Sequence, residues 1–117
     1  MRIAQISPLF ESVPPQFYGG TERVVSILTE GLLRKGHEVT LFASGDSKTN
    51  ARLVPICRKA LRLSNVKDPC ADHILQLARA YDRADEFDLI HSHIDYFTFP
   101  FAQKSANPTV TKLHGRL

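Results

Sequence analysis

The feature that most constrains the fold is a helical pattern enclosed by two short stretches rich in β-forming residues. Residues 21–35 carry one apolar stripe at helical spacing, formed by Val24, Leu28 and Leu32 with Val25 beside them. The flanking stretches, residues 2–7 and 38–43, predict strands. A strand, a helix and a second strand in this order predict one right-handed βαβ unit.

The ends of this helix also carry recognisable signals. Thr21 is expected to cap its first turn, where Glu22 complements the helix dipole. Gly36 is expected to provide the left-handed exit after Arg34 and Lys35.

The same alternation continues to the end of the chain. The expected elements are strand 52–56, helix 69–84 capped by Asp68, strand 87–92, helix 96–104 and strand 109–113. The buried stripe of helix 69–84 is expected to contain Ile74, Leu75, Ala78 and Tyr81. We therefore predict an α/β fold of one domain, residues 1–117, with a Rossmann-like, mostly parallel sheet and helices on both faces. The last strand leaves too little chain for another helix, so we expect a fragment or a surface covered by a partner.

Composition excludes several classes of protein. Apolar residues make up 43% and charged residues 23%, as in a soluble globular domain, and a net charge of +3 is too small for a nucleic-acid-binding signature. Cys57 and Cys70 do not suggest a disulfide framework, and no signal peptide or membrane span is recognisable, so we expect a cytoplasmic protein. A basic region, Arg58, Lys59, Arg62 and Lys67, is expected to be solvated or to touch anionic lipid as a peripheral contact.

Gly19 and Gly20 lie directly before the first predicted helix, at the carboxyl end of a strand. Glycines let the backbone turn tightly and let a ligand approach closely, and unpaired amides at a helix start bind phosphate. The pair therefore predicts an anion site, or else is only a loop before a helix.

Two further polar stretches follow predicted strands. His91, His93 and Asp95 lie at the end of one strand, and His114 with Gly115 follows the last. Residues two apart on a strand point to one side, so both histidines of the first stretch could converge. They could bind a metal, pack structurally or line a polar cleft beside the glycines. Because carboxyl ends of parallel strands share an edge, all three stretches are expected to meet at one rim.

A dinucleotide site is disfavoured. The loop before the first helix is much longer than a Rossmann fingerprint allows, and it reads Gly19-Gly20-Thr21-Glu22 in place of Gly-x-Gly-x-x-Gly. Asp46, beyond the second predicted strand, is weak evidence alone.

Taken in order, these segments resemble the amino terminus of family 4 (group 1) glycosyltransferases. The resemblance rests on residues 1–8, 18–25, 32–39, 88–93 and 112–115, and so spans nearly the whole chain. It implies the amino-terminal half of a GT-B fold, which mainly binds the acceptor, while an absent carboxyl-terminal half holds most of the nucleotide-sugar donor. It also implies transfer with retention at the sugar carbon, with no metal or other cofactor required.

The resemblance implies roles for individual residues. Gly19, Gly20 and Thr21 would face the donor diphosphate, and Gly115 would also bind substrate. His93 and Asp95 would line the sugar or acceptor site, with His93 in a catalytic role, and His114 would stabilise charge on the leaving diphosphate. We expect the isolated chain to be inactive. The acceptor, whether a sugar, a lipid or another small molecule, is left open. The alternatives are a non-catalytic sugar- or phosphate-binding or interaction module, which could pair with a second copy, and a metal hydrolase.

Overall fold

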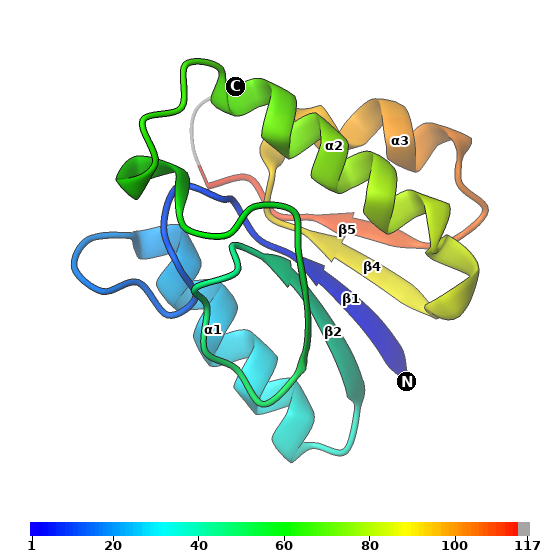
Figure 1. Cartoon of the computed structure of the whole chain (residues 1–117). Coiled ribbons are helices and arrows are strands. Elements are labelled where there is room, and N and C mark those ends of the chain that lie inside the picture. Colours follow the sequence, from blue (N-terminus) through cyan, green and yellow to red (C-terminus); the bar gives the residue numbers. More distant parts are fainter. Residues whose placement is uncertain (115–117) are drawn as a thin grey trace.

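The computed structural model describes residues 1–114, and it confirms the predicted α/β fold (Figure 1). The strands are β1 (Arg2–Ile6), β2 (Glu38–Ala43), β3 (Arg52–Pro55), β4 (Leu89–Ser92) and β5 (Thr109–Thr111). The helices are α1 (Gly20–Arg34), α2 (Pro69–Asp82) and α3 (Phe99–Lys104), with short 3₁₀ turns η1 (Leu61–Leu63), η2 (Ala84–Glu86) and η3 (Asp95–Thr98).

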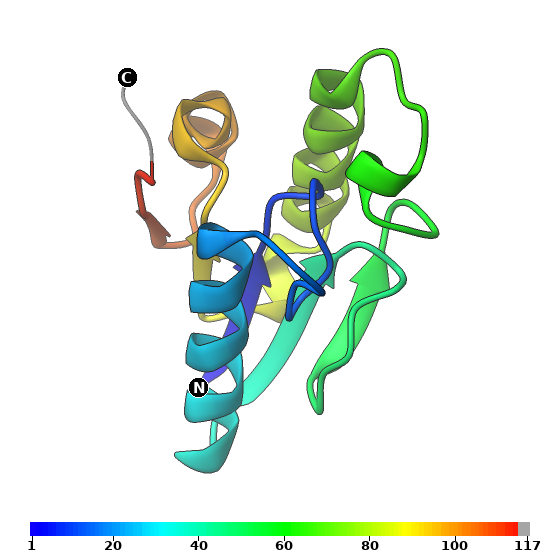
Figure 2. The same ribbon diagram turned by 90° about the vertical axis from the view of Figure 1, so that its left-hand side faces the viewer.

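Within residues 1–114 the strands form one parallel sheet in the order β3-β2-β1-β4-β5. The central strand, β1, pairs on both sides, so that Ile3 lies opposite Val39 of β2 and Leu89 of β4. Figure 2 shows the strand arrowheads and the first turn of α1 at the same end of the molecule. The sheet therefore gathers the loops that follow its strands along one rim.

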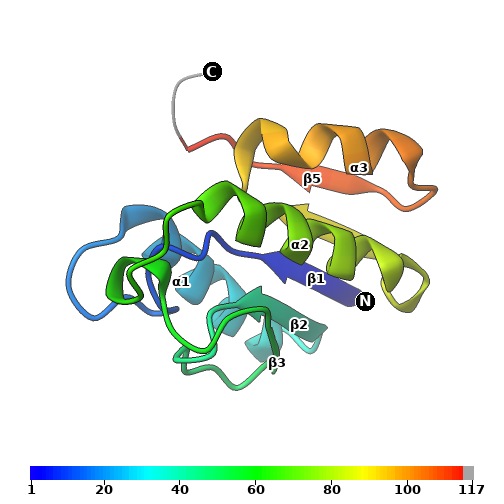
Figure 3. The ribbon, with the colours of Figure 1, turned by 45° about the horizontal axis from the view of Figure 1, so that its top comes forward.

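Helices cover both faces of the sheet, as predicted. Helices α2 and α3 lie beside each other on one face (Figure 3). The core beneath them contains Ala4, Ile6, Phe42, Leu77, Ala80, Phe87, Ile90 and Ile94. Helix α1 covers the other face, where its Val25 is buried with Val13, Leu41 and Ala43. Since neighbouring residues of a strand face opposite ways, Phe42 and Leu41 contribute to different cores. Among residues 1–114, no helix combines the length and apolar character needed to cross a bilayer.

The predicted stripe of α1 is rotated by one residue. Val24 is 37% exposed, whereas Val25 and Thr29 are fully buried and Glu22 is 5% exposed. The helix therefore turns its Val25 and Thr29 side toward the sheet, a displacement of about 100° around the helix axis.

The stripe predicted for α2 was wrong at Ile74 and Leu75, whereas Ala78 is half-buried and Tyr81 packs against the core as expected. Ile74 and Leu75 are 44% and 57% exposed, and the buried side contains His73, Gln76, Leu77 and Ala80. Polar side chains occupy the inner face because they have backbone partners there. Gln76 Nε2 donates to the carbonyl oxygens of Ser7 and Phe42, at 3.1 and 2.8 Å.

The predicted helix caps also differ from the structure. Gly19 precedes α1, and Thr21 lies inside its first turn, so Thr21 is not the cap. Asp68 does precede Pro69 at the start of α2, but its side chain makes no capping hydrogen bond. Gly36 adopts the predicted left-handed conformation, with φ of 92°.

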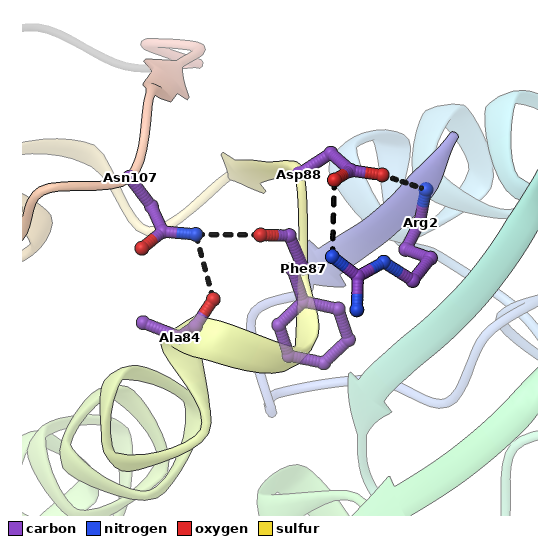
Figure 4. A network of polar contacts seen from close by, with 5 residues as sticks. All are labelled: Arg2, Ala84, Phe87, Asp88 and Asn107. Atoms are coloured by element: carbon purple, nitrogen blue, oxygen red, sulfur yellow. Dashed lines mark hydrogen bonds and ion pairs between the residues drawn. The ribbon is translucent and has the colours of Figure 1, made fainter.

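A polar network fixes the other end of the sheet, away from the rim (Figure 4). Asn107, just before β5, donates through Nδ2 to the carbonyl oxygens of Ala84 and Phe87, at 2.6 and 2.5 Å. Asp88 accepts from the backbone N–H of Arg2 at 2.8 Å and from its guanidinium at 3.1 Å. These contacts tie the starts of β1, β4 and β5 together.

Replacing Asn107 with alanine should therefore lower the free energy of unfolding by about 1–3 kcal/mol, because two carbonyl oxygens lose their donor. Urea denaturation measures this change. The exposed Asn65, replaced by alanine, is the matched control and should change stability by less than about 0.5 kcal/mol. Equal stability of the two variants would contradict the role given to Asn107.

Candidate functional site

The loops after β1 and β4 and the residues after β5 meet at the rim and enclose a groove of about 330 Å³. Its lining consists of Pro8, Phe10, Tyr18, Gly19, Gly20, Thr21, Glu22, Arg62, His93, Asp95 and His114. Six of the residues predicted from the sequence are therefore brought together: Gly19, Gly20, Thr21, His93, Asp95 and His114. Gly115, which was also predicted, lies outside the described residues.

The two glycines serve different purposes. A Cβ atom on Gly19 would lie 3.0 Å from Glu11 Cγ and 3.1 Å from both Pro15 Cβ and Glu22 Oε1, so this glycine is required by close packing. A Cβ on Gly20 would meet nothing within 4 Å. Neither residue adopts the left-handed conformation, since the φ of Gly19 is 164°, which is extended backbone. Gly20 is thus the position that leaves the start of α1 open to the groove, where unpaired helix amides attract anions.

Acidic and basic side chains surround this helix start. Glu11 and Glu22 are 8% and 5% exposed, and Arg62 forms an ion pair with Glu11. Burial, and then the charge of Glu11, raise the pKa of the Glu22 carboxyl. Arg62 had been assigned to a solvated or lipid-facing basic region. Its side chain is 63% exposed, in agreement with a solvated surface, and it also forms the ion pair with Glu11 beside the groove. Arg58, Lys59 and Lys67 are exposed as well.

Three imidazoles form a stack at the groove, in which neighbouring rings are tilted by 36° and 33°. The ring centroid of His93 lies 4.3 Å from that of His91 and 5.3 Å from that of His114. His93 is 1% exposed, its Nδ1 lies 3.0 Å from His114 Nε2, and its Nε2 lies 2.9 Å from Gln5 Oε1. The predicted convergence of His91 with His93 is therefore present, although His91 is not part of the groove lining.

The stack favours uncharged rings. Burial, followed by the proximity of His91, His114 and Lys112, lowers the pKa of His93 to about 3. Burial and Lys112 also lower the pKa values of His91 and His114, and Asp95 opposes this effect at His114. The ordinary pKa of histidine is about 6.5, so these rings are neutral around pH 7.

Asp95 holds His114 in this position. Its Oδ1 accepts the backbone N–H of His114 at 3.0 Å. Asp95 has φ of 44°, a left-handed conformation that costs energy for a residue with a side chain. Backbone strain of this kind is concentrated at functional sites, which agrees with the position of Asp95 in the groove.

Within residues 1–114, no group of three His, Cys, Asp or Glu side chains is arranged to hold a metal ion. Of the His91, His93 and Asp95 set, two members already use their potential ligand atoms in hydrogen bonds within the protein. Both ring nitrogens of His93 are engaged, and one oxygen of Asp95 binds the His114 amide.

A second cavity, of about 230 Å³, adjoins the groove and shares Pro8, Phe10, His93 and Asp95 with it. Its other residues are Cys70, His73, Ile94, Tyr96 and Phe97. The exposed rings of Phe10 and Tyr96 flank it, and Phe10 packs on His73 with ring centroids 5.0 Å apart. The groove thus continues from a polar part into an apolar, aromatic part.

Sequence reasoning missed Gln5, Glu11 and Arg62 as residues of the site. A signal existed for Gln5, because it is the polar residue within an otherwise apolar buried strand. Glu11 lies in a loop and Arg62 in a basic stretch, and no local pattern indicates that they pair across 51 positions of the chain.

The chain is similar to known glycosyltransferases in sequence and in fold. The family model described as Glycosyltransferase Family 4 matches residues 18–117. The crystal structure of AviGT4, a glycosyltransferase involved in avilamycin A biosynthesis, is similar with a TM-score of 0.66 and 25% sequence identity. The similarity covers 97% of this chain and 32% of AviGT4. No curated protein sequence matches the chain significantly.

The buried imidazole of His93 predicts a pH dependence of stability. Because its pKa is lowered in the folded state, the unfolded chain binds more protons below pH 6.5. The stabilising contribution is therefore present above pH 6.5 and is lost as the pH falls toward 3. We expect the free energy of unfolding to fall by about 1–2 kcal/mol between pH 7 and pH 5.

Urea denaturation at both pH values measures this loss, and His93→Gln, which removes the titrating ring, should show a smaller one. Gln76→Met removes another buried polar side chain without removing a titrating group, and it should keep the dependence of the wild type. A His93→Gln protein with an unchanged pH dependence would exclude His93 as its source.

Proposed function

Because the chain belongs to glycosyltransferase family 4, we propose that it is the amino-terminal, acceptor-side domain of an enzyme that transfers a sugar from a nucleotide-sugar donor to an acceptor. The observation that carries the proposal is the groove, in which the start of α1 faces Asp95 and His114 across the rim. The chain spans 32% of AviGT4, and we propose that a separate donor-binding half completes the site.

The polar part of the groove is proposed to bind the donor diphosphate. As the bond to the sugar breaks, negative charge develops on this leaving group. Amides aimed at such charge lower the barrier, and Gly20 and Thr21 lie in the first turn of α1, where amides and the helix dipole are available. Glu11 and Glu22 would repel a diphosphate, and Arg62 offsets part of this repulsion through its pair with Glu11.

The histidines are proposed to differ in role. His93 has both ring nitrogens engaged within the protein, which disfavours direct contact with substrate and favours a supporting role. His114 lines the groove and uses one ring nitrogen toward His93. We therefore assign to His114 the contact with the reacting sugar and the leaving diphosphate.

The adjoining cavity is proposed to hold the acceptor. Its walls are aromatic at Phe10, Tyr96 and Phe97, and the carboxylate of Asp95 lies between the cavity and the groove. A hydroxylated ring, such as a sugar, could pack against the aromatic walls and direct a hydroxyl group toward Asp95.

Retention at the sugar carbon, the absence of a required cofactor and a cytoplasmic location are part of the same proposal, which rests on the family.

A non-catalytic interaction module is the second candidate. It is favoured by exposed apolar side chains at and after β5, where Val110 is 49% and Leu113 is 42% exposed. Val110 pairs in register with His91 and therefore lies on the face of the sheet that α1 covers only in part. Sedimentation analysis distinguishes this candidate, because a stable dimer would support it.

Binding of a nucleoside diphosphate tests the first candidate. We expect UDP or GDP to shift the amide resonances of Gly20 and Thr21 in NMR titrations. Gly20→Ala adds a methyl group to the open face of the helix start and should weaken this binding about tenfold, equivalent to ~1.4 kcal/mol.

Gly31→Ala is the matched control, since it lies in the same helix and its Cβ would meet only Arg34, at 3.7 Å. Gly31→Ala lies in the helix interior and should gain about 0.5–1 kcal/mol of stability from helix propensity, but it should leave binding unchanged. Equal affinities of the two variants for the diphosphate would argue against an anion site at Gly20.

The isolated chain should show no sugar transfer with any of several nucleotide sugars, because donor binding needs the other half of the fold. Chromatographic detection of glycosylated acceptor measures this. Clear turnover by the 117-residue chain would refute the requirement for a second half.

A further inference from the structure

Gln5 is a polar side chain at the centre of the sheet. It lies on β1, it is fully buried, and its Oε1 is 2.9 Å from Nε2 of His93. Its Nε2 has no hydrogen-bond partner among residues 1–114. The bond to His93 is therefore the side chain's one hydrogen bond within the described part of the chain, and an unpaired buried amide costs stability. We therefore expect Gln5 to matter more for the orientation of the His93 ring than for the stability of the fold.

This bond has a direction. A carbonyl oxygen can only accept a hydrogen bond, so Nε2 of His93 must carry the hydrogen. The neutral ring then has a lone pair on Nδ1. That nitrogen lies 3.0 Å from Nε2 of His114, which must therefore be the donor. One acceptor at the end of the series determines the tautomers of both rings.

These two hydrogen bonds, between Gln5 and His93 and between His93 and His114, leave one ring nitrogen of the two histidines without a partner. Nδ1 of His114 has no partner among residues 1–114, and His114 lines the groove. A proton added there breaks none of the hydrogen bonds described above. A proton added to Nδ1 of His93 would break the bond to His114.

We propose that Gln5 is a positioning residue that acts through His93 to hold His114 as the Nε2–H tautomer, with Nδ1 of His114 as the one ring nitrogen of His93 and His114 that exchanges a proton with a ligand. The catalytic meaning of this assignment rests on the proposed function. The tautomers themselves exist without substrate and can be measured independently.

The assignment gives His114 two states at the same atom. When neutral, Nδ1 accepts a hydrogen bond from a hydroxyl group of a sugar. When protonated, Nδ1 donates to an anionic oxygen, as on a leaving diphosphate. The charged and titratable groups around the ring are His91, His93, Lys112 and Asp95, with Glu22 and Arg62 in the same groove, and Asp95 favours the protonated state. His93 remains neutral in both states, in agreement with its pKa of about 3.

NMR of the 117-residue chain labelled with ¹⁵N-histidine tests this inference, because two-bond ¹H–¹⁵N correlations identify the tautomer of each ring. At neutral pH we expect His93 and His114 to be single Nε2–H tautomers. On acidification His114 should take up its proton at Nδ1 while His93 stays neutral. Gln5→Met keeps the length of the side chain but removes the acceptor, and the single tautomer of His93 should be lost.

Gln76→Met is the matched control. Gln76 is also buried, at 1% exposed, but it binds the carbonyl oxygens of Ser7 and Phe42. This variant should leave both tautomers unchanged. An Nδ1–H tautomer of His93 in the wild type would overturn the proposal, because the amide of Gln5 would then be the donor. Unchanged tautomers in folded Gln5→Met would also overturn it.

The wild-type spectrum alone decides the tautomers if Gln5→Met does not fold. Failure of UDP or GDP to bind, with the expected tautomers present, would count against the proposed function and leave the role of Gln5 toward the histidines intact.

Discussion

Parallel pairing of β1 with strands on both of its sides is the interaction on which the rest of the structure depends. It gives β1, β4 and β5 a common direction, so the chain segments after them reach one rim. The long loop between β1 and α1 then has room to bring the start of α1 to the same rim. A site built from residues nearly one hundred positions apart follows from this one constraint, in agreement with the general location of ligands in open α/β sheets.

The two ends of the sheet use polar groups differently. At the amino-terminal end, Asn107 and Asp88 satisfy backbone groups and fix the strands. Toward the carboxyl-terminal end, Gln5 and Gln76 lie in buried positions, and each has one side-chain atom without a partner among residues 1–114, as do Thr29 of α1 and His37 just before β2. Native proteins rarely leave buried polar atoms unpaired, and of these four residues only Gln5 is hydrogen-bonded to a residue of the groove. The strain at Asp95 belongs to the same end.

The groove combines opposing electrostatic influences. The dipole of α1 favours an anion, whereas the buried Glu11 and Glu22 disfavour one. Arg62 offsets part of the negative charge through its ion pair with Glu11. The neutral imidazoles add little charge of their own around pH 7. A diphosphate would therefore rely on directed hydrogen bonds more than on net charge, which agrees with the proposal that a separate half supplies the strong anion binding.

The sequence by itself determined the α/β class, the order of the elements and the meeting of Gly19, Gly20, His93, Asp95 and His114 at one rim. These follow from local propensity and from the rule that parallel strands share an edge. Only the tertiary structure decided which helix faces are buried, because the rotation of α1 and the polar inner face of α2 depend on partners distant in the chain. It also decided that close packing requires Gly19, whereas Gly20 has open space around it. Finally, it placed Gln5 against His93, since a hydrogen bond between residues 88 positions apart leaves no local signal in the sequence.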